Sequence, residues 1–155
     1  MTHNLPCFIL CCTIILLVGC GPKGRSLKVE YVEGIVTFDG QSVPSAHVTF
    51  HPAAQRGTTE SAGGVSRATG IYKLSSANGD PEKGAVAGDY IVTVSKVEVI
   101  DPNVGRSYEE VVTNPLPVTE KPFLPAVYAT PDKTPLKVTV KPGKNKIDLE
   151  LKNSP

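Results

Sequence analysis

The reactive thiols of this 155-residue chain all lie near its N-terminus. The four cysteines are Cys7, Cys11, Cys12 and Cys20, and none occurs in residues 21–155. A disulfide bond or a zinc ion held by cysteines is therefore excluded within that part of the chain. Any chemistry performed by a thiol belongs to the N-terminal segment.

His47 and His51 are the histidines that follow this segment. They are four residues apart in a stretch whose apolar residues alternate, as in a strand. At about 3.3 Å per residue they would lie about 13 Å apart, whereas a zinc ligand lies about 2 Å from its metal. The spacing predicts two side chains on an exposed polar face and no shared metal ion.

Two further patterns match known reactive sites only in part. Ser66 lies in the stretch Gly64–Ala68, which is similar to a nucleophile elbow, but an elbow requires a helix after the serine and no helical periodicity follows. Four aspartates in turn-forming segments are not spaced like a calcium-binding loop; they are Asp39, Asp80, Asp89 and Asp101. We therefore expect no catalytic residue, no metal and no cofactor.

Cys20 stands at the end of an apolar run, residues 5–19. As a helix this run would be about 22 Å long, which is short of the roughly 30 Å hydrocarbon core of a bilayer and typical of a secretory signal. Leu17-Val18-Gly19-Cys20 resembles the bacterial lipobox. The resemblance implies that residues 1–19 are a signal peptide, that cleavage occurs before Cys20, and that the Cys20 thiol carries the lipid.

The alternative is an uncleaved anchor helix. Basic residues follow the apolar run at Lys23, Arg25 and Lys28, and the positive-inside rule would keep that side in the cytoplasm. In the lipoprotein interpretation residues 20–29 form a tether, and the domain lies in the periplasm or on the cell surface, anchored to the cell membrane or the outer membrane. Gly21, in place of the aspartate that favours the inner membrane in such lipoproteins, favours the outer membrane.

The net charge of +1 argues against nucleic acid as a partner, because phosphate binding depends on clustered lysine and arginine. Near the C-terminus five lysines are interleaved with Asp148 and Glu150; they are Lys137, Lys141, Lys144, Lys146 and Lys152. They predict a solvated face or, as the alternative, attraction to acidic glycans or lipid headgroups. The expected partners are thus the membrane, through the lipid on Cys20, and an envelope protein or glycan.

Residues 30–152 read as strands, because apolar residues recur at every second position. About seven short strands separated by turn residues predict an all-β antiparallel sandwich. The turns include Asp39-Gly40, a turn at Gly70 pairing residues 65–68 with 71–74, and Pro142–Asn145 within a C-terminal hairpin. A parity change near Lys96 predicts a bulge or a sheet edge. The predicted core comprises Val36, Val48, Val92, Val138 and Leu149.

Three segments of this body resemble carboxypeptidase regulatory-like domains, which have a transthyretin-like sandwich. They are VEGIVTFDG with VPSAHVTF at residues 32–40 and 43–50, GAVAGDYIVTV at 84–94, and LPAVY with TPL at 124–128 and 134–136. The resemblance implies a fold without catalysis of its own. The alternative is a small envelope hydrolase of transthyretin-like fold with an unrecognised active site. The hydroxyisourate hydrolases of that fold end in Tyr-Arg-Gly-Ser, whereas this chain ends in LKNSP.

The segment 101–135 is long and rich in proline, and its pattern predicts an irregular connection. Long loops on rigid scaffolds often carry binding sites. We therefore expect a partner-binding loop here, with Tyr108, Phe123 and Tyr128 as its aromatic residues. A disordered insertion is the alternative.

Overall fold

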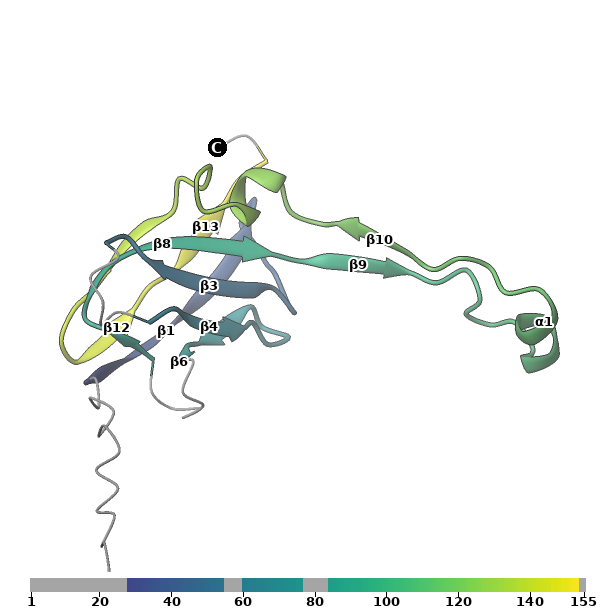
Figure 1. Ribbon diagram of the computed structural model, residues 1–155, viewed down its shortest axis with the longest axis horizontal. Helices are drawn as coiled ribbons and strands as arrows, with labels where there is room; N and C mark the ends of the chain where they lie inside the picture. Colours follow the sequence, from purple (N-terminus) through teal and green to yellow (C-terminus); the bar gives the residue numbers. More distant parts are fainter. Residues whose placement is uncertain (1–27, 55–59, 77–83, 154–155) are drawn as a thin grey trace, which may run out of the picture.

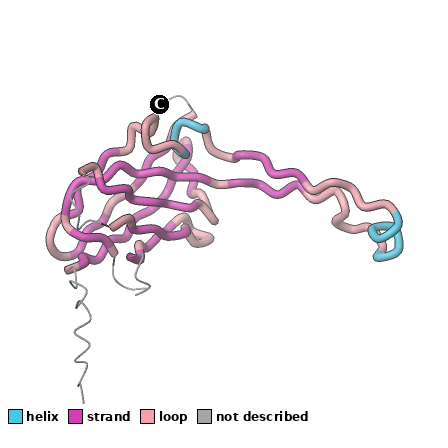
Figure 2. The backbone as a smooth tube through the Cα atoms, in the orientation of Figure 1, coloured by secondary structure: helices cyan, strands magenta, loops and turns pink. Residues whose placement is uncertain are grey.

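The computed structural model describes residues 28–54, 60–76 and 84–153, so Cys20 and the expected signal peptide lie outside the described residues. Two β-sheets pack against each other, and a long two-stranded arm leaves them at one side (Figure 1). Strands make up most of the regular structure, as the backbone view in Figure 2 shows. In the part described, no helix is long and apolar enough to cross a membrane. The predicted all-β sandwich is confirmed.

The first sheet is organised around β1 (Val29–Phe38), which alternates between buried and half-buried residues along its length. Three short strands pair with β1 in antiparallel orientation: β2 (Gln41–Ser42), β5 (Ile71–Lys73) and β7 (Ala85–Val86). Two C-terminal strands pair with it in parallel orientation: β12 (Lys144–Lys146) and β13 (Leu149–Leu151).

The second sheet has the order β11-β8-β3-β4-β6, and all its pairings are antiparallel. Its strands are β3 (His47–Pro52), β4 (Ala62–Val65), β6 (Ser75–Ser76), β8 (Gly88–Ser95) and β11 (Lys137–Val140). β8 is an inner strand of this sheet, since it pairs with β3 over six residues and with β11 over four. The arm continues from the end of β8.

The core lies between the two sheets and contains apolar residues from both. Four of the five predicted core residues are almost fully buried, namely Val36, Val48, Val92 and Leu149. Val138 is only partly buried, because it lies on β11, at the edge of its sheet, and packs against the core from that edge. The neighbouring Val140 takes the buried position on this strand.

The predicted C-terminal hairpin is wrong. β11 lies in the second sheet, whereas β12 and β13 lie in the first. The Pro142–Asn145 turn therefore carries the chain from one sheet to the other, with Gly143 at a φ of 100° and the Asn145 side chain accepting from the Lys141 N–H. The first sheet is mixed and not antiparallel throughout.

The pairing expected around Gly70 is only partly present. A turn does form there, with the Arg67 carbonyl accepting from the Gly70 N–H. However, β5 pairs with β1 in the first sheet, while β4 pairs with β3 and β6 in the second. The predicted Asp39-Gly40 turn is confirmed, since both residues have positive φ in a tight turn between β1 and β2. The parity change near Lys96, which predicted a bulge or a sheet edge, instead marks the point where the chain leaves the second sheet, between β8 and β9.

Ser66 is a buried structural residue. Its hydroxyl donates to the Val43 carbonyl at 2.6 Å and accepts from the Ala46 N–H at 2.8 Å, both buried bonds. These bonds hold the segment before β3 to the end of β4. Because the serine directly follows β4 and no helix comes directly after it, it lacks the context of a nucleophile elbow.

Replacing Ser66 with alanine should lower the free energy of unfolding by roughly 1–3 kcal/mol, because the Ala46 N–H and the Val43 carbonyl would lose a buried partner. The exposed Ser95, with no such bonds to lose, is the matched control, and Ser95→Ala should change stability by less than about 0.5 kcal/mol. Urea unfolding of both variants measures the difference. Equal, small effects at the two sites would show that the hydrogen bonds of Ser66 do not matter.

Candidate functional site

The arm consists of β9 (Val97–Ile100) and β10 (Thr119–Pro122), joined by a loop that carries the short helix α1 (Tyr108–Thr113). It projects away from the sandwich, with α1 at its far end (Figure 1). The register pairs Val97 with Pro122 and Val99 with Glu120. The segment 101–135 is therefore not one irregular connection, since part of it is strand and helix.

The tip of the arm is held by its own hydrogen bonds. Ser107 and Glu110 form a capping box at the start of α1, in which the Ser107 hydroxyl accepts from the Glu110 N–H and the Glu110 carboxylate accepts from the Ser107 N–H. The hydrogen bonds that Glu110 receives from the backbone and side chain of Ser107 lower the pKa of its carboxyl group. The Arg106 guanidinium donates to Asn103 and to the carbonyl of Asn114. These contacts give the tip a defined shape.

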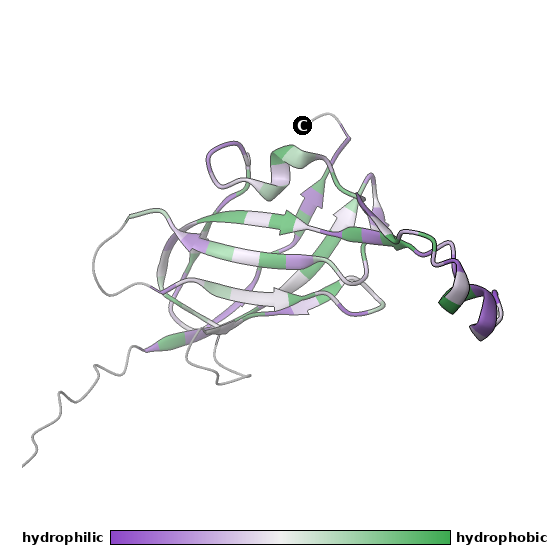
Figure 3. Cartoon of the chain, turned by 45° about the vertical axis from the view of Figure 1, so that its right-hand side comes forward, coloured by the Kyte–Doolittle hydropathy of each residue, from purple (hydrophilic) through white to green (hydrophobic). Residues whose placement is uncertain are grey.

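Apolar side chains are exposed along the whole arm. Figure 3 shows that apolar and polar residues are interleaved along its ribbon. Of the eleven large apolar side chains exposed among the described residues, nine lie between residues 97 and 123, which is far more than the arm's share of the chain; they are Val97, Val99, Ile100, Val104, Tyr108, Val112, Leu116, Val118 and Phe123. The same segment has five acidic and two basic residues, for a net charge of −3. The arm is thus an apolar and acidic surface.

The three aromatic residues predicted for a partner-binding loop lie in three different places. Tyr108 is 86% exposed at the tip. Phe123 lies at the base, where its ring meets Phe38 at a centroid distance of 6.1 Å and the Lys96 ammonium at 4.3 Å. Tyr128 is only 2% exposed.

Tyr128 belongs to the core and is not available to a partner. It lies in the 3-10 helix η1 (Ala126–Ala129). Its hydroxyl donates to the carbonyl of Lys152 at 3.1 Å and accepts from the Lys152 N–H at 2.9 Å. Sequence reasoning placed it in the loop because its role depends on a contact with the far C-terminal end of the chain.

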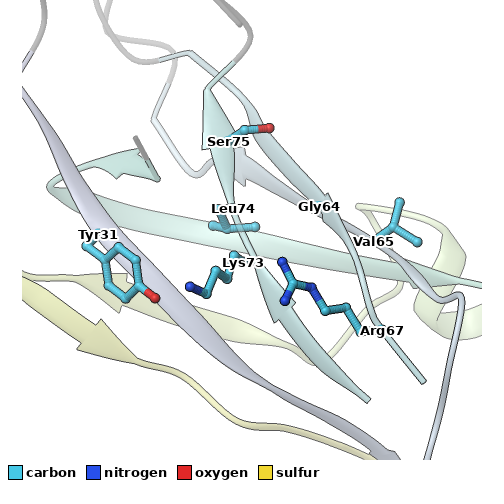
Figure 4. Close-up of a pocket in the computed structure, with 7 residues that line it drawn as sticks. All are labelled: Tyr31, Gly64, Val65, Arg67, Lys73, Leu74 and Ser75. Carbon is cyan, nitrogen blue, oxygen red and sulfur yellow. The ribbon is translucent and has the colours of Figure 1, made fainter. Parts of the chain in front are cut away.

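A second feature is a cleft of about 510 Å³ between β4, which belongs to the second sheet, and β5, which belongs to the first. Its lining residues are Tyr31, Gly64, Val65, Arg67, Lys73, Leu74 and Ser75. In Figure 4 the amino group of Lys73 lies between the Tyr31 ring and the Arg67 guanidinium. No pattern in the sequence marked Arg67 and Lys73, because only the fold brings β1, β4 and β5 together here.

Positively charged side chains outnumber negatively charged ones at this cleft. The Lys73 ammonium lies 5.4 Å from the centre of the Tyr31 ring, and the Tyr31 hydroxyl donates to the Glu33 carboxylate at 2.6 Å. Interaction with Tyr31 raises the pKa of Lys73, Glu33 adds to this, and the positive charge of Arg67 opposes it. Two cations therefore face one carboxylate.

The remaining candidate residues make ordinary structural contacts. His47 is exposed, and His51 shares a hydrogen bond with Thr93 at 3.0 Å. Asp101 accepts from the Asn103 N–H in a turn, and Asp89 accepts from Thr139; Asp80 lies outside the described residues. Within the described ranges no three histidine, cysteine or acidic side chains form a group that could hold a metal.

The five C-terminal lysines are all exposed, as expected for a solvated face. Lys146 forms an ion pair with Asp148 at 3.5 Å. Because this pair is at the surface, its contribution to stability is small. Attraction of acidic glycans or lipid headgroups to this face stays a prediction.

No family model, curated protein or solved structure matches this chain. The resemblance to carboxypeptidase regulatory-like domains therefore stays a prediction from the quoted motifs. Of the features above, one could have been found in the sequence: Ser107 followed three residues later by Glu110 is the usual signal of a helix start.

Proposed function

We propose that this protein is a lipid-anchored, non-catalytic β-sandwich module of the bacterial cell envelope that binds a partner protein through its arm. The anchor rests on the sequence Leu17-Val18-Gly19-Cys20. The binding role rests on one observation, the concentration of exposed apolar side chains on residues 97–123.

The arm's exposed apolar residues have no evident role in folding the sandwich. No residue between Val97 and Pro122 belongs to the buried core, and an isolated two-stranded hairpin is marginally stable in water. Exposed apolar side chains that are concentrated on one part of a domain, among polar ones, usually mark an interaction site. A partner that covers the arm would bury these side chains and stabilise the hairpin.

The charge of the arm indicates what kind of partner fits. An apolar surface with a net charge of −3 is complementary to a groove that has apolar walls and basic residues at its rim. A partner protein offers such a groove, and the exposed ring of Tyr108 on the arm is the aromatic anchor that would enter it. The hydrogen-bonded tip reduces the conformational entropy lost on binding.

The proposed anchor and the base of the arm lie at opposite ends of β1. The expected tether joins the sandwich at Val29, where β1 begins, whereas the base of the arm contacts Phe38, where β1 ends. At about 3.3 Å per residue these ends are about 30 Å apart. A lipid on Cys20 would therefore leave the arm on the side away from the tether.

An arm-deletion variant tests this proposal. Asn-Gly replaces residues 98–121, which leaves Val97 and Pro122 to flank a two-residue hairpin loop. The variant should melt at the same temperature as the wild type and should still be found in the membrane fraction. It should no longer form the cross-link to a partner protein that the wild type forms in intact cells.

Single substitutions give the matched comparison. Val112→Ser removes an apolar side chain from the arm, and Ile71→Ser removes one from the sandwich, at exposed fractions of 61% and 42%. Only Val112→Ser should weaken binding of the partner once that partner is purified. Equal binding by the deletion variant and the wild type would overturn the proposed role of the arm.

A further inference from the structure

The cleft between β4 and β5 has the features of a built anion site. Its position is fixed, because the Arg67 N–H donates to the Ile71 carbonyl at 2.8 Å and the Leu74 N–H donates to the Val32 carbonyl at 3.0 Å. Gly64 permits close packing here, since a Cβ at this position would lie 2.2 Å from the Lys73 carbonyl oxygen. The two cationic side chains therefore project from a closely packed seam.

Arg67 has no counter-ion within the part of the chain that the structure describes. None of the ion pairs and side-chain hydrogen bonds found there involves its guanidinium. Glu33 is the one carboxylate that acts on Lys73, and it already accepts from the Tyr31 hydroxyl. The cleft therefore has one positive charge in excess, on the group best suited to bind a carboxylate through two parallel hydrogen bonds.

The other lining groups suit a sugar. The Ser75 hydroxyl donates to the Gly63 carbonyl and keeps its oxygen free to accept from a ligand hydroxyl. The Tyr31 hydroxyl, which donates to Glu33, can accept in the same way. Val65 is 50% exposed and supplies an apolar contact at the rim. The volume of about 510 Å³ is within the usual range of small-molecule sites.

We propose that this cleft binds a carboxylated sugar, such as a uronic acid residue of an acidic glycan. The carboxylate lies between the guanidinium of Arg67 and the ammonium of Lys73, and the ring hydroxyls meet Tyr31 and Ser75 (Figure 4). One excess positive charge matches a singly charged carboxylate better than a doubly charged phosphate. This site is separate from the arm, so it adds a second ligand to the proposed function and does not depend on it.

Nuclear magnetic resonance titration of the full chain in detergent micelles tests the proposal, with glucuronate as the probe. Glucuronate should produce saturable shifts at the amides of Lys73, Leu74 and Ser75, whereas glucose and inorganic phosphate should not at the same concentrations. Arg67→Gln and Lys73→Gln should each raise the dissociation constant at least tenfold. Lys137→Gln, which removes an exposed lysine from β11 in the second sheet, is the control and should leave it unchanged.

Several results would overturn the assignment. Absence of saturable shifts, or equal affinity of all three variants, would show that the cleft does not bind the sugar. Equal response to glucuronate and phosphate would show unselective attraction of anions. Arm deletion should leave the titration unchanged, so failure of this proposal is distinguishable from failure of the arm's proposed role.

Discussion

Gly34→Ala is expected to prevent stable folding of the sandwich. A Cβ at this position would lie 1.7 Å from the carbonyl oxygen of Ile147, and the Ile147 N–H donates to the carbonyl of the adjacent Glu33 at 2.8 Å. The backbone between β12 and β13 would therefore have to move away from β1. Because both parallel pairings of the first sheet meet here, we expect a loss of more than about 4 kcal/mol of unfolding free energy, a large part of a typical total.

Gly63→Ala is the matched control for this prediction. Gly63 also lies in a strand, but a Cβ there would be 3.5 Å from the nearest atom, the Val48 carbonyl oxygen, which is ordinary contact. This variant should be neutral or slightly stabilised, because alanine restricts the unfolded chain. Chemical denaturation compares the two. If Gly34→Ala melts like Gly63→Ala, the parallel packing of the C-terminal strands on β1 is wrong.

Cys20→Ser is expected to abolish incorporation of radiolabelled fatty acid, because serine offers no thiol for attachment of the diacylglycerol. Each buried methylene contributes about 0.8 kcal/mol to membrane binding, so two acyl chains suffice for stable anchoring. The basic residues of the tether would add only about 1 kcal/mol each at an anionic surface. The variant should also keep its signal segment, because cleavage at a lipobox follows acylation.

Two comparisons make this prediction specific. Cys12→Ser should retain the label, since Cys12 lies within the apolar run. With residues 1–20 replaced by an ordinary secretion signal, the domain should appear in the soluble periplasmic fraction. Equal label on the wild type and Cys20→Ser, or no label on either, would return the uncleaved anchor helix to first place.

The strands could be predicted because burial alternates locally. Residues two positions apart lie on the same face of a strand. In each predicted strand the residues on one face are apolar, and that face is buried, as at Val36, Val48, Val92 and Leu149. Alternation shows which face of a strand is buried but not which sheet it joins. β12 joins the first sheet by pairing with β1 across more than a hundred residues, whereas β11 joins the second by pairing with β8. No local pattern encodes these pairings.

The candidate sites were less predictable, because they depend on exposure and on distant contacts. The sequence indicated that a binding segment lies after Asp101, but it could not separate the exposed Tyr108 from the buried Tyr128. That difference arises from the hydrogen bonds between Tyr128 and Lys152. Arg67 and Lys73 share a cleft only because the chain crosses between the sheets after β4.

Site-specific photo-cross-linking in intact cells tests the central claim most directly. A photoreactive phenylalanine analogue is placed at Tyr108 on the tip, and at Lys137 on the exposed edge of the sandwich as the control. We expect one discrete protein adduct from position 108, found in the membrane fraction, and none from position 137. No adduct from position 108, or the same adduct from both positions, would contradict the proposal that this protein binds its partner through the arm.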